Sequence, residues 1–110
     1  ETNIHILSFD LQVLQLAHSL APQWRCVLNL PEQEPDQVMA LAPSAIEGLW
    51  AVDGRIGRLT PALLGWAKTR GLRVFTYTCN GPRQVHKALR LGVDALLTDR
   101  PRCLTDYLKR

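Results

Sequence analysis

Short apolar segments recur along the chain and alternate with stretches whose apolar residues lie three or four positions apart. The apolar segments cover residues 4–9, 24–30, 46–52, 72–78 and 93–98, so each begins about twenty residues after the previous one. The stretches between them have the amphipathic pattern of helices, as Val13, Leu16, Ala17 and Leu20 illustrate. Regular alternation of strands and helices is typical of parallel pairing through right-handed crossovers. The pattern therefore predicts an α/β fold with five parallel strands.

Local signals predict where several helices begin and end. Asp10 and Thr60 are expected to cap the helices that follow them, because their side-chain oxygens can accept a bond from a free backbone N–H. Pro61 suits the first helical position. Gly71 and Gly92 are expected to adopt the left-handed conformation that closes a helix.

Polar residues follow or adjoin the third and fifth predicted strands. Asp53-Gly54 is predicted to end the third strand, and a final helix is expected from Pro101. Asp94 and Asp99 lie beside the fifth strand, and we interpret both as structural groups that accept backbone hydrogen bonds.

Composition limits the class of protein. A chain of 110 residues that is 46% hydrophobic and 21% charged predicts one domain over residues 1–110. No apolar stretch approaches the roughly 20 residues needed to cross a bilayer, so no membrane span is expected. Cys26, Cys79 and Cys103 are far apart and contain no Cys-x-x-Cys pair, which favours reduced thiols over disulfides or zinc. We therefore expect a cytoplasmic protein.

Positive charge is concentrated in the second half of the chain. Of the 13 Lys and Arg residues, only Arg25 lies before residue 54, and the sequence pI is about 9.0. Such a distribution suits attraction of phosphate or nucleic acid. Several of these residues fall near predicted helix C-termini, where cations complement the helix dipole, and no aromatic-interleaved binding motif accompanies them. We therefore expect no nucleic-acid partner.

Four short motifs follow the predicted strands in a distinctive order. They are Ser8-Phe9-Asp10, Tyr77-Thr78-Cys79-Asn80, Gly92-Val93-Asp94 and Thr98-Asp99-Arg100-Pro101. In sequence and spacing they resemble the C-terminal half of the glycerophosphodiester phosphodiesterase family, metal-dependent hydrolases built on the (β/α)₈ TIM barrel. The resemblance implies that this chain is a partial TIM barrel comprising strands four to eight.

The chain differs from the family in lacking its catalytic motifs. His5, His18 and His86 do not match the family's histidines, since neither a His-Arg-Gly nor a His-Asp sequence is present. The resemblance implies that the catalytic histidines and the Asp and Glu ligands of a divalent cation, Ca²⁺ or Mg²⁺, lie upstream of Glu1. We therefore expect no catalytic or metal-binding residue in this chain, and no activity from the chain alone.

The motif positions and the strand ends together indicate a substrate-binding wall. We expect Ser8, Phe9, Trp50, Tyr77 and Asn80 to bind a glycerophosphodiester, because they lie at or near predicted carboxyl ends of strands, where barrel sites are built. Ser8 is expected to form hydrogen bonds there rather than act as a nucleophile, since no histidine base adjoins it. Core packing remains the alternative for Phe9 and Trp50. The complete enzyme is expected to release glycerol phosphate and an alcohol.

An arc of five strands cut from a closed barrel has two open edges, and open edges invite pairing. We therefore expect a partner: either the missing N-terminal half of the barrel or a second copy of the chain. Two other functions stay open at this point. The chain is alternatively a non-catalytic regulatory module derived from the same fold, or a basic domain that binds phosphate or nucleic acid.

Overall fold

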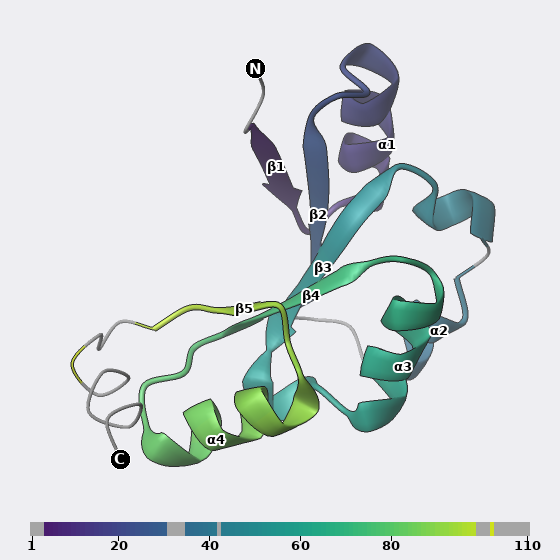
Figure 1. Cartoon of the computed structure of the whole chain (residues 1–110). Coiled ribbons are helices and arrows are strands. Elements are labelled where there is room, and N and C mark those ends of the chain that lie inside the picture. Colours follow the sequence, from purple (N-terminus) through teal and green to yellow (C-terminus); the bar gives the residue numbers. More distant parts are fainter. Residues whose placement is uncertain (1–3, 31–34, 42, 99–101, 103–110) are drawn as a thin grey trace.

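The strands of the protein form one parallel sheet (Figure 1). The computed structural model of the chain describes residues 4–30, 35–41, 43–98 and 102. Within these residues the sheet has five strands in the spatial order β1-β2-β3-β4-β5, and every adjacent pair is parallel. The strands are β1 (His5–Ser8), β2 (Arg25–Asn29), β3 (Leu49–Arg55), β4 (Arg73–Tyr77) and β5 (Ala95–Leu96). The predicted α/β architecture is confirmed.

The connecting helices begin and end at the expected signals. They are α1 (Leu11–Leu20), α2 (Pro35–Met39), α3 (Pro61–Thr69) and α4 (Pro82–Leu91), with 3₁₀ turns η1 (Pro43–Ile46) and η2 (Ile56–Arg58). Asp10 Oδ1 accepts a hydrogen bond of 2.9 Å from the Gln12 N–H, and Thr60 Oγ1 accepts one of 3.2 Å from the Leu63 N–H. Gly92 closes α4 with a φ of 77°, as predicted for a left-handed cap.

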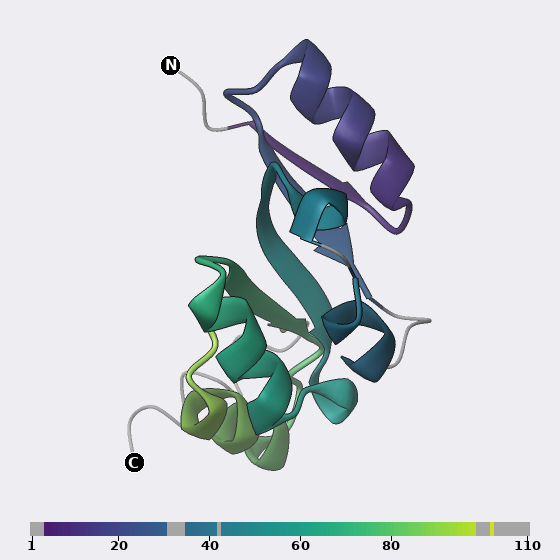
Figure 2. The same ribbon diagram turned by 90° about the vertical axis from the view of Figure 1, so that its right-hand side faces the viewer.

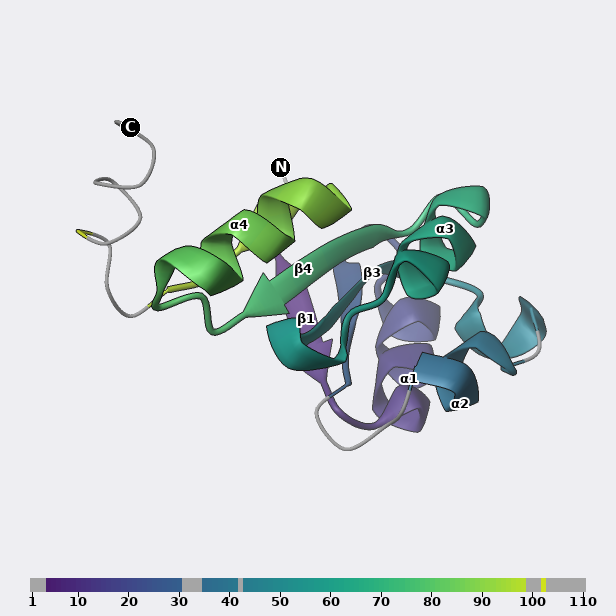
Figure 3. The same ribbon diagram turned by 90° about the horizontal axis from the view of Figure 1, so that it is seen from below.

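The helices lie on one side of the sheet, and the core lies between them and the strands (Figures 2 and 3). Buried residues of the strands meet buried residues of the helices in one apolar cluster. Its members include Leu14, Cys26, Leu28, Val52, Leu63, Trp66, Val74, Val85 and Ala88. Burial of this face is the main term that holds the helices to the sheet.

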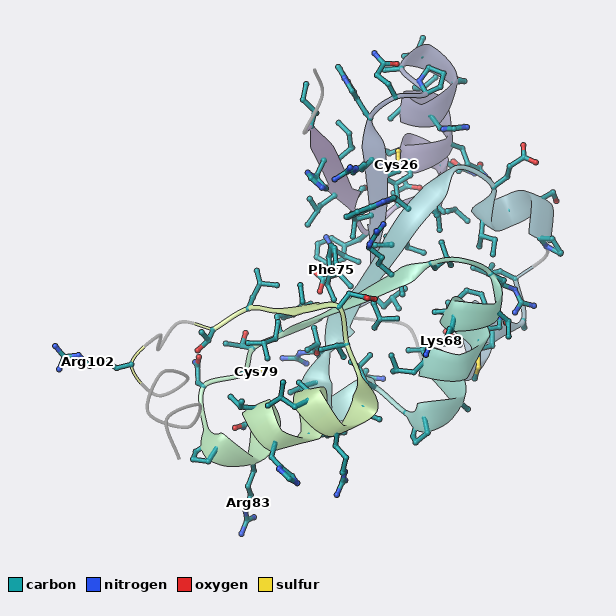
Figure 4. The ribbon with its side chains drawn as sticks, viewed as in Figure 1. Cys26, Lys68, Phe75, Cys79, Arg83 and Arg102 are labelled. Atoms are coloured by element: carbon teal, nitrogen blue, oxygen red, sulfur yellow. The ribbon has the colours of Figure 1, made fainter. Side chains whose placement is uncertain are left out.

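The other face of the sheet carries larger and more polar side chains. On β4, Arg73, Phe75 and Tyr77 alternate with the buried Val74 and Thr76, so they project from the face opposite the core. Figure 4 shows Cys26 directed toward α1 and Phe75 on the far side of the sheet. None of the described helices covers this second face.

The third strand differs from its prediction. We expected it over residues 46–52 with Asp53-Gly54 as its end, but β3 runs from Leu49 to Arg55. Its last three residues pair with Phe75, Thr76 and Tyr77, so parallel pairing satisfies the backbone where the sequence predicted a turn. The shift places Asp53 inside the sheet.

The end of the chain contributes less to the described structure than the sequence suggested. β5 covers only Ala95–Leu96, although the flanking backbone extends the pairing, since Asp94 N donates to Val74 O and Leu97 N to Thr76 O. Asp94 Oδ2 also accepts a hydrogen bond of 2.8 Å from Val74 N, which confirms its structural role. Asp99 lies outside the described residues, and so does the predicted final helix apart from Arg102. No described helix is long and apolar enough to span a membrane.

Replacing Gly48 by alanine should destabilise the protein. Gly48 has a φ of 88°, and a Cβ there would lie 2.5 Å from the His18 ring, so Gly48→Ala introduces both backbone strain and a clash. We expect the free energy of unfolding to fall by about 2 kcal/mol in urea denaturation. Gly57→Ala is the matched control, because its Cβ would meet nothing within 4 Å. Equal losses in the two variants would contradict the interpretation.

Candidate substrate site at the carboxyl ends of the strands

A hollow opens where β3 and β4 end. Its volume is about 800 Å³, and its polar lining comes from Arg55, Arg58, Thr60, Tyr77 and Thr78. Arg55 and Tyr77 are the last residues of their strands and are partners in the parallel register. The hollow therefore lies at the edge where parallel α/β proteins bind their ligands.

Tyr77 is a sequence-predicted site residue, and the structure places it at this edge. Burial raises the pKa of its phenol, the nearby Asp53 carboxylate raises it further, and the Arg55 guanidinium opposes both effects. The hydroxyl consequently remains protonated near neutral pH. It can donate a hydrogen bond to an oxygen of a ligand in the hollow.

Asp53 is a candidate that the sequence analysis missed. The residue is 5% exposed, and its Oδ1 has no hydrogen-bond partner among the described residues. Burial raises the pKa of the carboxyl group from its ordinary 3.8 to about 6. The sequence analysis placed Asp53 in a turn at the end of the strand, so it did not identify this residue as a buried group of the sheet. An alternation of faces continued through Ala51, Asp53 and Arg55 would have indicated its position.

Asn80, the second site residue near β4, is anchored to the last strand region. Thr98 Oγ1 donates a hydrogen bond of 2.9 Å to Asn80 Oδ1. The adjacent Cys79 is fully buried, and its N–H donates to Leu97 O over 2.9 Å. Burial raises the pKa of the Cys79 thiol, so it stays neutral. The loop after β4 is thereby held against the segment after β5.

Ser8 is the last residue of the edge strand β1, on the other side of the sheet, and Phe9 follows it. Ser8 Oγ accepts a hydrogen bond of 3.0 Å from Asp10 N, so it helps to form the turn into α1. Phe9 is 61% exposed, which excludes core packing within the described chain. Because β2 and β3 lie between β1 and β4, the structure does not bring Ser8 and Phe9 beside Tyr77 and Asn80.

Trp50 lies at the opposite end of the strands from Tyr77. We expected it near a carboxyl end, and that position is wrong because β3 begins at Leu49. The register shifts here: Cys26 pairs with Leu49 but Val27 with Ala51, so Trp50 is an extra residue opposite β2.

The indole of Trp50 is the centre of a cluster on the open face of the sheet. The guanidinium carbons of Arg25 and Arg73 lie 4.7 Å and 4.6 Å from its ring centroid. The His5 and Phe75 rings meet it edge-on at 5.1 Å and 5.5 Å. These contacts support a packing role for Trp50.

The described residues do not by themselves form a site for a divalent cation. No three His, Cys, Asp or Glu side chains among them are grouped so that they could hold a metal ion. The polar side chains around the hollow carry guanidinium and hydroxyl groups. Ca²⁺ and Mg²⁺ instead require several oxygen ligands, usually including carboxylates.

The fold and the polar residues at its carboxyl edge define this chain as part of a (β/α)₈ barrel. It belongs to the glycerophosphoryl diester phosphodiesterase family, whose model matches residues 1–103. The resemblance inferred from the four sequence motifs is thereby confirmed. No curated protein sequence matches the chain.

Solved structures share the fold. A protein from Silicibacter pomeroyi, assigned to the glycerophosphoryl diester phosphodiesterases, is 28% identical with a TM-score of 0.74 over 96% of this chain and 37% of its own. A phosphodiesterase from Oleispira antarctica, solved with the product sn-glycerol-3-phosphate, is 18% identical with a TM-score of 0.77, covering 96% of this chain and 42% of its own. The chain thus spans less than half the length of these structures.

The raised pKa of Asp53 should make the stability of the chain depend on pH. The folded protein favours the neutral carboxyl, so the cost of ionising it is absent below pH 4, develops between about pH 4 and 6, and is complete above that. Relative to the parent, Asp53→Asn should therefore gain about 2 kcal/mol in unfolding free energy between pH 4 and pH 7.5.

Urea denaturation at several pH values measures this gain, with the exposed Glu47→Gln as the control. Parallel stability profiles for the parent and Asp53→Asn would show that Asp53 is not desolvated in the folded chain.

Proposed function

We propose that this chain forms the C-terminal wall of the substrate site in a phosphodiesterase that hydrolyses glycerophosphodiesters to glycerol phosphate and an alcohol. The observation that carries the proposal is the family match over residues 1–103. The motif residues Tyr77 and Asn80 at the carboxyl edge of the sheet support it. This edge is where barrel enzymes place their ligand-facing groups.

Each wall residue suits part of a glycerophosphodiester. The protonated hydroxyl of Tyr77 suits an oxygen of the diester, and its ring suits the carbon skeleton. Asn80 is held in place by Thr98 and can orient the same moiety. Phe9 offers an exposed apolar surface across the barrel mouth, and Ser8 shapes the turn that carries it. Trp50 packs at the other end of the strands and is not part of this wall.

The wall alone does not supply the chemistry. Hydrolysis of a phosphodiester requires neutralisation of charge on the phosphoryl oxygens and a proton donor for the leaving alkoxide. We infer that the complete enzyme obtains both from histidines and from a Ca²⁺ or Mg²⁺ ion held by residues outside this chain. A cytoplasmic location is part of the same proposal, because Cys26 and Cys79 are free thiols.

We propose that the partner of the chain is the rest of the barrel. β1 and β5 each pair with only one described strand, which leaves an open edge on each side of the sheet. Beside the β1 edge, α1 exposes Val13, Leu16 and Leu20, an apolar stripe at helical spacing. A second copy is less suited to the open face of the sheet, where it would bring Arg25 and Arg73 against their own counterparts.

The isolated chain should not hydrolyse glycerophosphocholine, even with added Ca²⁺ or Mg²⁺. Release of glycerol phosphate, followed by ³¹P NMR, should occur only with the complete polypeptide from the same gene. In that polypeptide Tyr77→Phe and Asn80→Ala should raise KM several-fold through lost hydrogen bonds, with the exposed Gln84→Ala as the control. Turnover by the isolated chain would overturn the division of roles. An inactive complete polypeptide would instead favour a non-catalytic module.

The apolar stripe on α1 should make the isolated chain associate. Sedimentation velocity should show concentration-dependent oligomers for the parent chain, and the double variant Leu16→Glu and Leu20→Glu should reduce them. Gln12→Glu with Gln23→Glu adds the same charge at exposed polar positions and serves as the control. A parent chain that stays monomeric at all concentrations would count against a missing partner at this surface.

A further inference from the structure

The polar side chains that line the hollow at the ends of β3 and β4 are either positively charged or carry hydroxyl groups. Arg55 and Arg58 bring two positive charges, and Thr60, Tyr77 and Thr78 bring hydroxyl groups. No carboxylate of the described residues is among its lining. A lining of this kind suits a ligand that carries negative charge and accepts hydrogen bonds, and it repels a cation.

The donors converge because of the sheet register. Arg55 and Tyr77 pair across β3 and β4, and the Arg55 charge influences the pKa of the Tyr77 phenol. Thr60 caps the first turn of α3, so the positive end of the helix dipole also adjoins the hollow. Side chains from two strands and the turn before α3 thus meet at one place.

The hollow does not suit the cation that the proposed hydrolysis requires. It has no metal-binding group of three His, Cys, Asp or Glu within the described chain. On the proposed function the reacting phosphoryl group lies beside that cation, which Arg55 and Arg58 would repel, so the hollow suits a second anionic group of the substrate.

We propose that this hollow binds an acidic group on the alcohol moiety of the substrate, either a carboxylate or a phosphate monoester. The inference deepens the proposed function and rests on it in so far as the anion belongs to a glycerophosphodiester. It names a substrate class: diesters whose alcohol carries an additional negative charge. Arg55 is the principal specificity residue, because its exposed guanidinium at the end of β3 can make a charge-assisted, bidentate contact.

Anion binding can be measured on the 110-residue chain without any assay of activity. Titration with inorganic phosphate should produce saturable amide shifts at Arg55, Thr60 and Thr78 in ¹H–¹⁵N NMR spectra. Arg55→Gln should weaken this binding roughly tenfold, as expected for loss of a charged hydrogen-bond partner. Arg90→Gln removes the same charge from an exposed position on α4 and should leave it unchanged.

Loss of saturable binding in the parent, or equal weakening in Arg55→Gln and Arg90→Gln, would overturn the site. If Arg55→Gln does not fold, as judged by its NMR dispersion, Thr78→Val provides the second variant, and unchanged phosphate affinity there would overturn the site as well.

Substrate selection by the complete polypeptide tests the source of the anion. Arg55→Gln should reduce kcat/KM roughly tenfold for a glycerophosphodiester whose alcohol bears a phosphate, and leave it nearly unchanged for glycerophosphocholine. Equal reduction for both substrates would show that the hollow holds the diester phosphate itself and would overturn the proposed class. If neither diester is hydrolysed, the proposed function fails, while the phosphate titration still reports on the site.

Discussion

The parallel pairing of β3 with β4 is the interaction on which the rest of the site depends. It places Asp53 beside Phe75, Gly54 beside Thr76 and Arg55 beside Tyr77. The buried hydroxyl of Thr76 donates a hydrogen bond of 2.8 Å to Gly54 O, which adds a side-chain link to the backbone ladder. A change of register by one residue would send Arg55 and Asp53 to the helix-covered face and remove the hollow.

The two faces of the sheet follow different physical rules. The helix-covered face is packed with apolar side chains from α1, α3 and α4, so burial of apolar surface stabilises it. The open face holds charged and aromatic groups, and Trp50 accommodates the guanidinium groups of Arg25 and Arg73 through cation–π contacts. In a closed barrel this face would line the interior, where such charges require partners from the other strands.

Membership of the phosphodiesterase family and the absence of a metal-binding group in the described residues fit one explanation. A (β/α)₈ barrel assembles its site from the ends of several strands, so a contiguous part of the chain can hold binding residues while the reactive groups lie on other strands. The chain spans 37% of the Silicibacter pomeroyi structure, in keeping with such a division. On the proposed function, the donors around Arg55 and Tyr77 form a binding surface that the other strands of the barrel would complement.

Local signals in the sequence determined much of this protein. Asp10, Thr60 and Gly92 act within a single turn of helix, so these signals do not depend on distant contacts. The motif around Tyr77 and Asn80 could be identified because its residues are contiguous in the sequence.

The tertiary structure alone decided the extent of β3, the burial of Asp53 and the cluster around Trp50. These features arise from backbone pairing with β2 and β4, which overrides the turn tendency of Asp53-Gly54 because paired backbone groups are far more stable than buried unpaired ones. Pairing joins residues about twenty positions apart, and the hydrophobic pattern along the sequence does not show which of them will pair.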